Sequence, residues 1–417
     1  MFKFLKRLFK VKLFFKIPQK KDILIYDNEG SGFIIQSLNK DSYEILHTRG
    51  ETLNIFILLK LLLSFRFNYK GYLDEYIKFV DPKVLITWID NNLDFYKYKN
   101  EKLKKIAIQN GRRSSLNSDI FFNLREKINN KEKYYADYLF VHSQSVKKIY
   151  EKFINSKICV TGSFRSNNEQ ISNNKKSNDI LYISTFRNST VGNENKILVN
   201  NYLNGNYTTR DWINHELRLL KWLKFYSLKY KRKISILGSQ IDYENELNHY
   251  KKNLNLKFNF IEKTENRKTY QILDESKIIV GIDSSLLNEA LGRGCNVVFF
   301  SYRGNTYPLN SRKFGWPENF SMNGKFWTKN PDYQSFSKTM NFYNSKSHIV
   351  SKNLRNKVMV FDKKNVKFLN ILNNILKNYK FKFINYLNFA FRILSTYLFD
   401  FLYCLFKNHS YSTHYIL

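Results

Sequence analysis

With 417 residues, 43% of them hydrophobic and 17% aromatic, the chain can bury the cores of two domains, which excludes an intrinsically disordered protein. Its 69 Lys and Arg residues outnumber its 35 Asp and Glu residues, and the net charge of +34 predicts an anionic partner: a membrane surface, a nucleotide or a nucleic acid. Cys159, Cys295 and Cys404 are too few and too far apart for a disulfide framework or a metal site, which fits a reducing cytoplasm.

The first 21 residues mix basic and apolar side chains without the order of a signal peptide. Eight Lys and Arg residues precede the first acid, Asp22, and they interrupt the apolar positions instead of preceding an apolar core. We therefore expect residues 1–21 to form a basic amphipathic helix that lies on the anionic inner face of the plasma membrane. A surface helix packed on the protein itself is the alternative.

Short apolar segments that end in small polar residues alternate with helical segments along residues 22–165. This alternation is typical of a parallel, doubly wound sheet. The expected strands are residues 22–26, 43–47, 84–88, 106–108, 138–141 and 158–160. We predict that they build a first Rossmann-like domain.

Residues 166–178 are polar, have no apolar period and predict a linker. A second alternation follows, so residues 179–375 are expected to form a second Rossmann-like domain, followed by apolar helices over 376–417. Its expected strands are residues 180–184, 234–237, 258–261, 278–280 and 297–300, with a long helix at 212–230. Near the end of the chain, Arg392 and Asp400 interrupt the apolar stretch 383–406, which argues against a simple transmembrane span.

The segment Ser276–Phe300 contains a strand–helix–strand unit around which the second domain is organised. Asp283, Ser284 and Ser285 are N-cap residue types that follow an apolar strand, so they are expected to begin a helix at its carboxyl end. Open α/β sheets bind ligands at this place, and a helix N-terminus suits a phosphate. Glu289 lies one turn inside the helix, where its carboxylate can accept hydrogen bonds from ribose hydroxyls; a solvated charge is the alternative.

Two carboxylates and a histidine that follow strands of the first domain are candidates for a general base. Glu29 lies in a glycine-flanked turn and is the first candidate, followed by Asp90 and His142, because removal of a proton from a sugar hydroxyl requires a positioned carboxylate or imidazole. The alternatives are a helix-entry acid for Glu29 and a structural hydrogen-bonding role for His142. The loops expected to meet an acceptor contain Gly30, Asn91, Gln109, Asn110 and Gly111.

Basic and small polar residues after the strands of the second domain are candidates for binding the phosphates of a donor. Arg187, Lys263 and Arg293 are placed to meet phosphate, although chance placement is the alternative in so basic a chain. The expected donor-binding residues are Arg187, Gly238, Ser239, Lys263, Asp283, Ser284, Ser285 and Glu289. We expect no metal and no cofactor, because the sequence has no Asp-x-Asp triplet, no His/Cys cluster with ligand spacing and no Walker-type loop.

Several segments together resemble a family of bacterial surface-carbohydrate biosynthesis proteins. They are VLITWIDNN, IAIQNGRRS, YLFVHSQSVKKIY, ICVTGSFRSNN, IIVGIDSSLLNEALGRGCNVVFF and FGWPENFSMNGKFWT, and the resemblance covers about residues 22–345. The family is similar to GT-B glycosyltransferases, akin to Kdo transferases and to capsule and polysialic-acid synthesis enzymes. It implies two Rossmann-like domains that face a cleft and an inverting, metal-independent transfer from a nucleotide sugar.

The resemblance also implies roles for two glutamates. Glu29 matches the position of the base in Kdo transferases, and Glu289 matches the glutamate that binds the nucleotide ribose in many GT-B enzymes. The paired glutamate of retaining GT-B enzymes is absent, since Gly281 stands eight residues before Glu289. Inversion at the sugar is therefore the implied outcome.

Taken together, these features predict a glycosyltransferase on the cytoplasmic face of the membrane that builds lipopolysaccharide or capsule. The acceptor, lipid-linked or polysaccharide, is expected in the first domain and the nucleotide sugar in the second. A sugar-nucleotide epimerase of the same fold and a CDP-glycerol-type phosphotransferase are alternatives. A nucleic-acid-binding protein is the alternative from another class, but no RNP, KH or zinc signature supports it.

Overall fold

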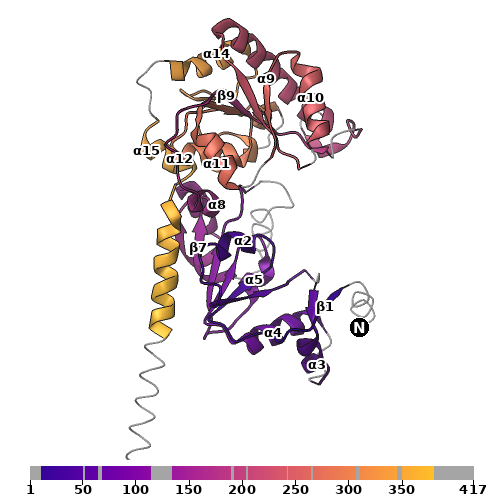
Figure 1. Cartoon of the computed structure of the whole chain (residues 1–417), viewed down its shortest axis with the longest axis vertical. Helices are drawn as coiled ribbons and strands as arrows, with labels where there is room; N and C mark the ends of the chain where they lie inside the picture. The colour runs from indigo at the N-terminus through magenta and orange to yellow at the C-terminus, as the bar shows by residue number, and fades with distance from the viewer. Residues whose placement is uncertain are drawn as a thin grey trace, which may run out of the picture. The chain divides into compact units, whose positions relative to one another are not determined.

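The computed structural model describes residues 11–49, 52–63, 68–113, 134–188, 192–202, 205–241, 243–263, 266–306, 310–344 and 350–379. The chain divides into two compact units, Met1–Lys367 and Phe368–Leu417. Both large sheets belong to the first unit. Figure 1 shows the described elements coloured along the chain.

The first large sheet is parallel, with the described strands in the order β3-β2-β5-β6-β7-β8. The strands are β2 (Ile23–Tyr26), β3 (Tyr43–Leu46), β5 (Val84–Thr87), β6 (Lys104–Ile108), β7 (Tyr134–Val141) and β8 (Ile154–Val160). The helices are α2 (Ser31–Ile35), α3 (Ile55–Leu63), α4 (Tyr69–Val80), α5 (Leu93–Lys97), α7 (Gln144–Tyr150) and α8 (Phe164–Asn168). Strands β2 and β5 are buried along their whole length, as strands covered on both faces are expected to be.

The second large sheet is also parallel, with the described strands in the order β13-β12-β9-β14-β15-β16. The strands are β9 (Asn178–Ile183), β12 (Ile234–Leu237), β13 (Asn259–Ile261), β14 (Ser276–Gly281), β15 (Val297–Phe300) and β16 (Trp327–Thr328). The helices are α9 (Thr209–Tyr230), α10 (Glu244–Leu254), α11 (Asn266–Asp274), α12 (Ser285–Arg293), α13 (Arg303–Thr306), α14 (Tyr333–Asn341) and α15 (Lys352–Val358). An antiparallel pair, β10 (Ile197–Tyr202) and β11 (Gly205–Thr208), precedes α9.

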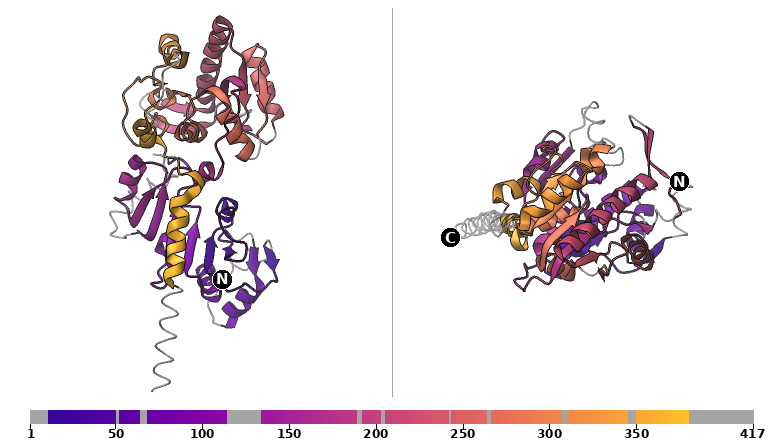
Figure 2. Two further views of the ribbon diagram at one scale, coloured as in Figure 1. Left: turned by 60° about the vertical axis from the view of Figure 1, so that its left-hand side comes forward. Right: turned by 90° about the horizontal axis from the view of Figure 1, so that it is seen from above.

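Helices cover both faces of the second sheet, which Figure 2 shows from two further sides. Ile180 and Tyr182 of β9 contribute to a core with residues of α9, α10 and α14, whereas Leu181 and Ile183 contribute to a core with residues of α11 and α12. Successive side chains of a strand point to opposite faces, so one strand supplies both cores. The predicted fold class, two parallel doubly wound sheets with helices, is confirmed.

The segment predicted as a linker is partly structured. Its first residues, 166–168, belong to α8, and Arg293 of α12 donates to the carbonyl oxygens of Ser166, Glu169 and Gln170 at 2.9–3.1 Å. Arg293 is buried and also pairs with Asp274 at 2.6 Å. The prediction that Arg293 meets phosphate is therefore wrong, because its guanidinium is used to hold this polar segment.

The described part of the N-terminal segment is not helical. Residues Lys12–Phe14 form β1, which pairs in parallel with β4 (Thr52–Asn54), and the side-chain Nδ2 of Asn54 donates to the Lys16 carbonyl oxygen at 2.7 Å. The helix predicted through residue 21 is therefore wrong beyond residue 11, because the backbone there bonds to another strand. Residues 1–10 and the apolar stretch 383–406 lie outside the described residues. Within the described segments, no helix has the length and apolar character of a membrane span.

Candidate active site

A cavity of about 360 Å³ lies at the carboxyl ends of β9, β12 and β14, where the sequence predicted donor binding. Small polar side chains and arginines dominate its lining. The lining residues are Arg112, Arg113, Ser184, Thr185, Phe186, Arg187, Trp212, Ser239, Gln240, Asp283, Ser284, Ser285, Ser311 and Arg312. Five predicted donor-binding residues are thus brought together: Arg187, Ser239, Asp283, Ser284 and Ser285.

The N-terminus of α12 opens into this cavity. Ser284 is the N-cap, and its hydroxyl accepts from the amide of Leu286 at 3.3 Å. The helix ends at Arg293 with Gly294 in the left-handed conformation at φ 95°, as the glycines of the sequence predicted. A helix of this length presents partial positive charge at its N-terminus, so the position suits an anion.

Three arginines surround the indole of Trp212 at the base of the cavity. The guanidinium carbons of Arg303, Arg187 and Arg312 lie 3.6, 5.0 and 5.3 Å from its ring centroid. Such guanidinium–aromatic contacts are favourable and hold the planar groups in place. The cavity wall therefore presents a fixed cluster of positive charge.

Asp283 is the carboxylate of this cluster and is itself buried. It pairs with Arg303 at 3.1 Å and with Arg312 at 3.6 Å. Burial alone raises the pKa of Asp283, but Arg303, Arg312 and Arg112 hold it below its ordinary value. One carboxylate thus faces several arginines, which leaves the local charge positive.

The first sheet supplies two further arginines to the cavity, both from the segment after β6. Arg112 donates to the carbonyl oxygen of Lys313 at 2.6 Å, and Arg113 pairs with Asp90 at 3.2 Å. Burial and the neighbouring Arg312 lower the pKa of Arg112 to about 10, so the side chain remains charged at neutral pH. An anion in the cavity would therefore meet cations from both sheets.

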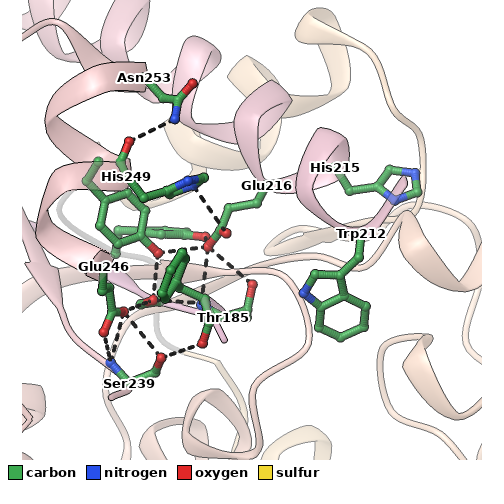
Figure 3. A network of polar contacts seen from close by, with 12 residues as sticks. Thr185, Trp212, His215, Glu216, Ser239, Glu246, His249 and Asn253 are labelled. Atoms are coloured by element: carbon green, nitrogen blue, oxygen red, sulfur yellow. Dashed lines mark hydrogen bonds and ion pairs between the residues drawn. The ribbon is translucent and has the colours of Figure 1, made fainter. Parts of the chain in front are cut away.

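Two buried carboxylates outside the cavity hold the loops that line it, as Figure 3 shows. Glu246 of α10 accepts from the backbone amides of Ser239 and Gln240 at 3.0 Å and from the hydroxyl of Ser184. Glu216 of α9 accepts from the amide and hydroxyl of Thr185 at 3.2 Å. Each loop thereby gains charge-assisted hydrogen bonds, which fix its backbone at the cavity edge.

Glu289 is neither a solvated charge nor part of the cavity lining. It is 3% exposed, and its carboxylate accepts from Ser163 at 3.1 Å, from Arg165 at 3.0 Å and from the hydroxyl of Tyr270. The solvated alternative is wrong because residues 163–165, which follow β8, cover this face of α12. Its predicted contact with a ribose stays a prediction.

The first base candidate, Glu29, lies in the turn between β2 and α2. Its carboxylate is 58% exposed and forms an ion pair with Arg49, which also donates to the buried Asp27 at 3.1 Å. Gly30 has φ 70°, and a side chain there would collide with Trp88, so the close approach of the turn to this indole requires glycine. The glycine thus serves packing, while Glu29 is accessible to a ligand.

The other two base candidates are enclosed by neighbours. Asp90 is fully buried, accepts from the hydroxyl of Tyr150 and the amide of Asn110, and pairs with Arg113. His142 is buried, with Nε2 3.2 Å from the carbonyl oxygen of Gln109, and burial lowers its pKa to about 4. Through these contacts, Asp90 and His142 hold neighbouring strand ends of the first sheet together.

The remaining predicted residues are dispersed. Gln109 donates to the Gly111 carbonyl oxygen at 2.8 Å and accepts from the His142 amide at 2.9 Å, and Asn110 accepts from Arg113. Asn91 and Lys263 are exposed, and neither lines the cavity. Gly238 packs against Phe260, where an added Cβ would lie 2.9 Å from the ring.

The sequence did not identify Arg112, Arg113, Trp212 or Arg312 as lining residues. The two arginines lie in the loop after β6, a few residues beyond its end at Ile108, so their position after a parallel strand was the available signal. Trp212 lies near the start of a helix like many core residues, and Arg312 lies in an irregular loop without a pattern. No group of three or more His, Cys, Asp or Glu side chains suited to a metal ion occurs within the described ranges.

Residues 106–376 match the sequence profile of a family described as "putative O-antigen biosynthesis protein". No curated protein sequence gives a match.

Three similar solved structures illustrate the fold comparison. A protein described as "putative UDP-N-acetylglucosamine 2-epimerase" from Listeria monocytogenes has a TM-score of 0.50 at 9% identity, covering 87% of this chain and 97% of that one.

The other two structures have lower TM-scores. A UDP-GlcNAc 2-epimerase from Methanocaldococcus jannaschii has a TM-score of 0.47 at 14% identity, covering 84% of this chain and 99% of that one. The wall teichoic acid polymerase TagF has a TM-score of 0.45 at 10% identity, covering 86% of this chain and 90% of that one. At these identities the similarity concerns the fold alone.

Proposed function

Since the chain belongs to this O-antigen biosynthesis family and has a GT-B-like fold, we propose that it is a glycosyltransferase of surface-polysaccharide synthesis. It would move a sugar from a nucleotide-sugar donor to a growing polysaccharide or lipopolysaccharide acceptor at the inner face of the plasma membrane. The observation that carries this proposal is the cationic cavity at the strand ends of the second sheet, lined by the N-terminus of α12 and by arginines.

In this proposal the donor diphosphate lies at the start of α12. Ser284 and Ser285 offer polar groups there, and Arg187 and Arg312 neutralise the charge on the phosphate oxygens. The bond between the sugar and the diphosphate breaks in the transfer, so negative charge develops on the departing nucleotide. Fixed cations at that place stabilise the charge as it forms, which is the usual means of accelerating such a step.

The acceptor hydroxyl forms the new bond to the sugar carbon and must lose its proton. Glu29 is the base we propose, because it is the exposed carboxylate among the three candidates, whereas Asp90 and His142 are buried among their neighbours. Attack from the face opposite the departing diphosphate gives inversion. No metal ion or cofactor enters the proposed step.

A two-stage experiment tests the transfer. Thermal shift with UDP-, GDP-, CDP- and CMP-sugars identifies the donor, since a ligand that binds only the folded chain raises its melting temperature. The stabilising donor is then incubated with and without acceptor extracted from O-antigen-producing membranes. We expect release of the nucleotide only when acceptor is present, with the sugar attached to the acceptor.

The same incubation distinguishes the alternatives. A sugar-nucleotide epimerase, the activity in the description of the Listeria monocytogenes protein, would produce the epimeric sugar without any acceptor. A phosphotransferase acting on a CDP-linked donor would release CMP, because the bond between the two phosphates breaks, whereas a glycosyltransferase releases CDP. Formation of either product in place of the glycosylated acceptor would overturn the proposal.

A further inference from the structure

A second hollow, of about 930 Å³, lies along the outer face of α9 and the residues that lead into α14. Its apolar lining comes from Leu217, Trp222, Phe225 and Tyr333, and Arg218, Lys221 and Lys229 add positive charge. It shares no lining residue with the cavity at the strand ends. We call it the α9 groove.

The exposed face of α9 carries both apolar and basic side chains. The buried face of this helix packs on the second sheet through residues such as Leu219 and Leu223, as expected for a helix of a doubly wound fold. On the other side, Phe225 is 49% exposed and Leu228 57% exposed. With Lys221 they follow the spacing that places residues on one face of a helix.

Positive charge prevails around the α9 groove, where Arg218, Lys221 and Lys229 outnumber the lining acid Asp332. Residues 217–241 contain seven basic residues and no acid. They are Arg218, Lys221, Lys224, Lys229, Lys231, Arg232 and Lys233. The acid at the groove, Asp332, caps α14 by accepting from the amide of Ser335 at 2.7 Å. The groove therefore complements an anionic partner.

The length of this surface selects the kind of partner. Arg218 and Lys229 are eleven positions apart, which is about 16 Å along a helix. A single phosphate would engage one part of such a row, whereas a layer of anionic headgroups can engage all of it. The half-exposed Phe225 and Leu228 are the side-chain types that enter the boundary between headgroups and acyl chains.

We propose that the α9 groove docks the protein on an anionic lipid bilayer. The basic residues meet the headgroups, and Phe225 and Leu228 enter the interfacial layer. This surface is distinct from the N-terminal segment predicted to lie on the membrane. Docking requires no turnover, so it can be tested even if the proposed glycosyl transfer is wrong.

The first test measures binding of the full chain to vesicles of phosphatidylcholine with and without phosphatidylglycerol. Because each basic residue near such a surface strengthens binding several-fold, the Lys221→Gln/Lys229→Gln variant should bind the anionic vesicles about 30-fold more weakly. The control is Lys251→Gln/Lys252→Gln, which removes the same charge from exposed positions of α10. Equal affinities of the two variants would overturn the proposal, and unchanged melting temperatures would show that both fold.

The second test locates the contact on the bound chain and is independent of other membrane-binding segments. An environment-sensitive fluorophore is attached to Phe225→Cys or, as a control, Lys252→Cys, with Cys404 replaced by Ser; Cys159 and Cys295 are buried. We expect a blue shift at position 225 with anionic vesicles and none at position 252. A label at 225 that stays in water on vesicle-bound protein, or that responds to soluble polyglutamate instead of vesicles, would contradict docking on lipid.

Discussion

The strand ends of the two sheets look alike in sequence but differ in structure. In the first sheet, polar residues after the strands bond to one another: Asp90 to Arg113 and Tyr150, and Gln109 to His142. In the second sheet, polar residues after the strands line a cavity, while carboxylates on α9 and α10 hold their loops from behind. The strand ends of the second sheet thus form most of the cavity wall, and the first sheet adds Arg112 and Arg113 from the segment after β6.

The largest expected effect concerns Glu29, the exposed carboxylate at the strand ends of the first sheet, and its absence would contradict the comparison. Glu29→Gln keeps the shape of the side chain and removes its charge. If Glu29 is the base, turnover should fall roughly 10²–10⁴-fold while the affinity for the donor is unchanged, because the base acts on the acceptor. Steady-state kinetics and donor titration measure the two quantities.

The matched variant is Asp90→Asn in the same sheet. Nearly full activity of Glu29→Gln together with an inactive, folded Asp90→Asn would transfer the base role to Asp90. Full activity of both variants would exclude both carboxylates as the base. The fold would be unaffected by either outcome.

A second prediction compares the buried ion pairs of the two sheets. Asp90→Asn and Asp283→Asn each leave a buried arginine without its carboxylate, so each should lower the free energy of unfolding by about 3–5 kcal/mol. Urea unfolding measures this loss, with the exposed Asp41→Asn as control. Asp283→Asn should change nucleotide affinity more than Asp90→Asn does, because Asp283 lines the cavity itself whereas Asp90 acts through Arg113. An equal change in both variants would contradict this order.

The third prediction concerns pH. The pKa of His142 is about 4 in the folded chain, below its ordinary value of 6.5, because burial disfavours the charged imidazole. The unfolded chain therefore binds this proton more tightly, so the contribution of His142 to stability is constant above pH 6.5 and falls as the pH drops from 6.5 through 4. His142→Gln should remove about 2–3 kcal/mol of this pH-dependent loss.

Urea unfolding at about pH 7, 5.5 and 4 gives the slope of the unfolding free energy against pH for the wild-type chain and for His142→Gln. The slope is the relevant quantity, since the substitution can also change stability at every pH. An identical slope in the variant would show that His142 does not titrate between its folded and unfolded values. Burial also lowers the pKa of His215 to about 4. His215 should therefore contribute part of the pH dependence of stability in both chains.

The smallest expected effect concerns nucleotide binding by the arginines that line the cavity. Arg187→Gln and Arg312→Gln should each weaken binding of the donor nucleotide about 10- to 100-fold, because a charge-assisted hydrogen bond to phosphate is lost. Arg49→Gln, at the strand ends of the first sheet, is the control. Isothermal titration with the nucleotide distinguishes them, and equal affinity in all three would place the phosphates elsewhere.

The sequence by itself determined the succession of strands and helices, because apolar runs and helix caps act over a few residues. Both parallel sheets, the cap at Ser284 and the end of α12 at Gly294 were predictable in this way. The same local signals located the loops around Arg187, Ser239 and Ser285, which line the cavity.

Only the tertiary structure decided which polar residues remain available to a ligand. Glu289 is buried because residues 163–165 pack on its face of α12. Arg293 is not available to a ligand because its guanidinium donates to backbone carbonyl oxygens of the polar segment after α8. Trp212 and Arg312 join the cavity from segments far from the strand ends in sequence. Burial and pairing depend on neighbours that are distant in the chain, so no local pattern could have revealed them.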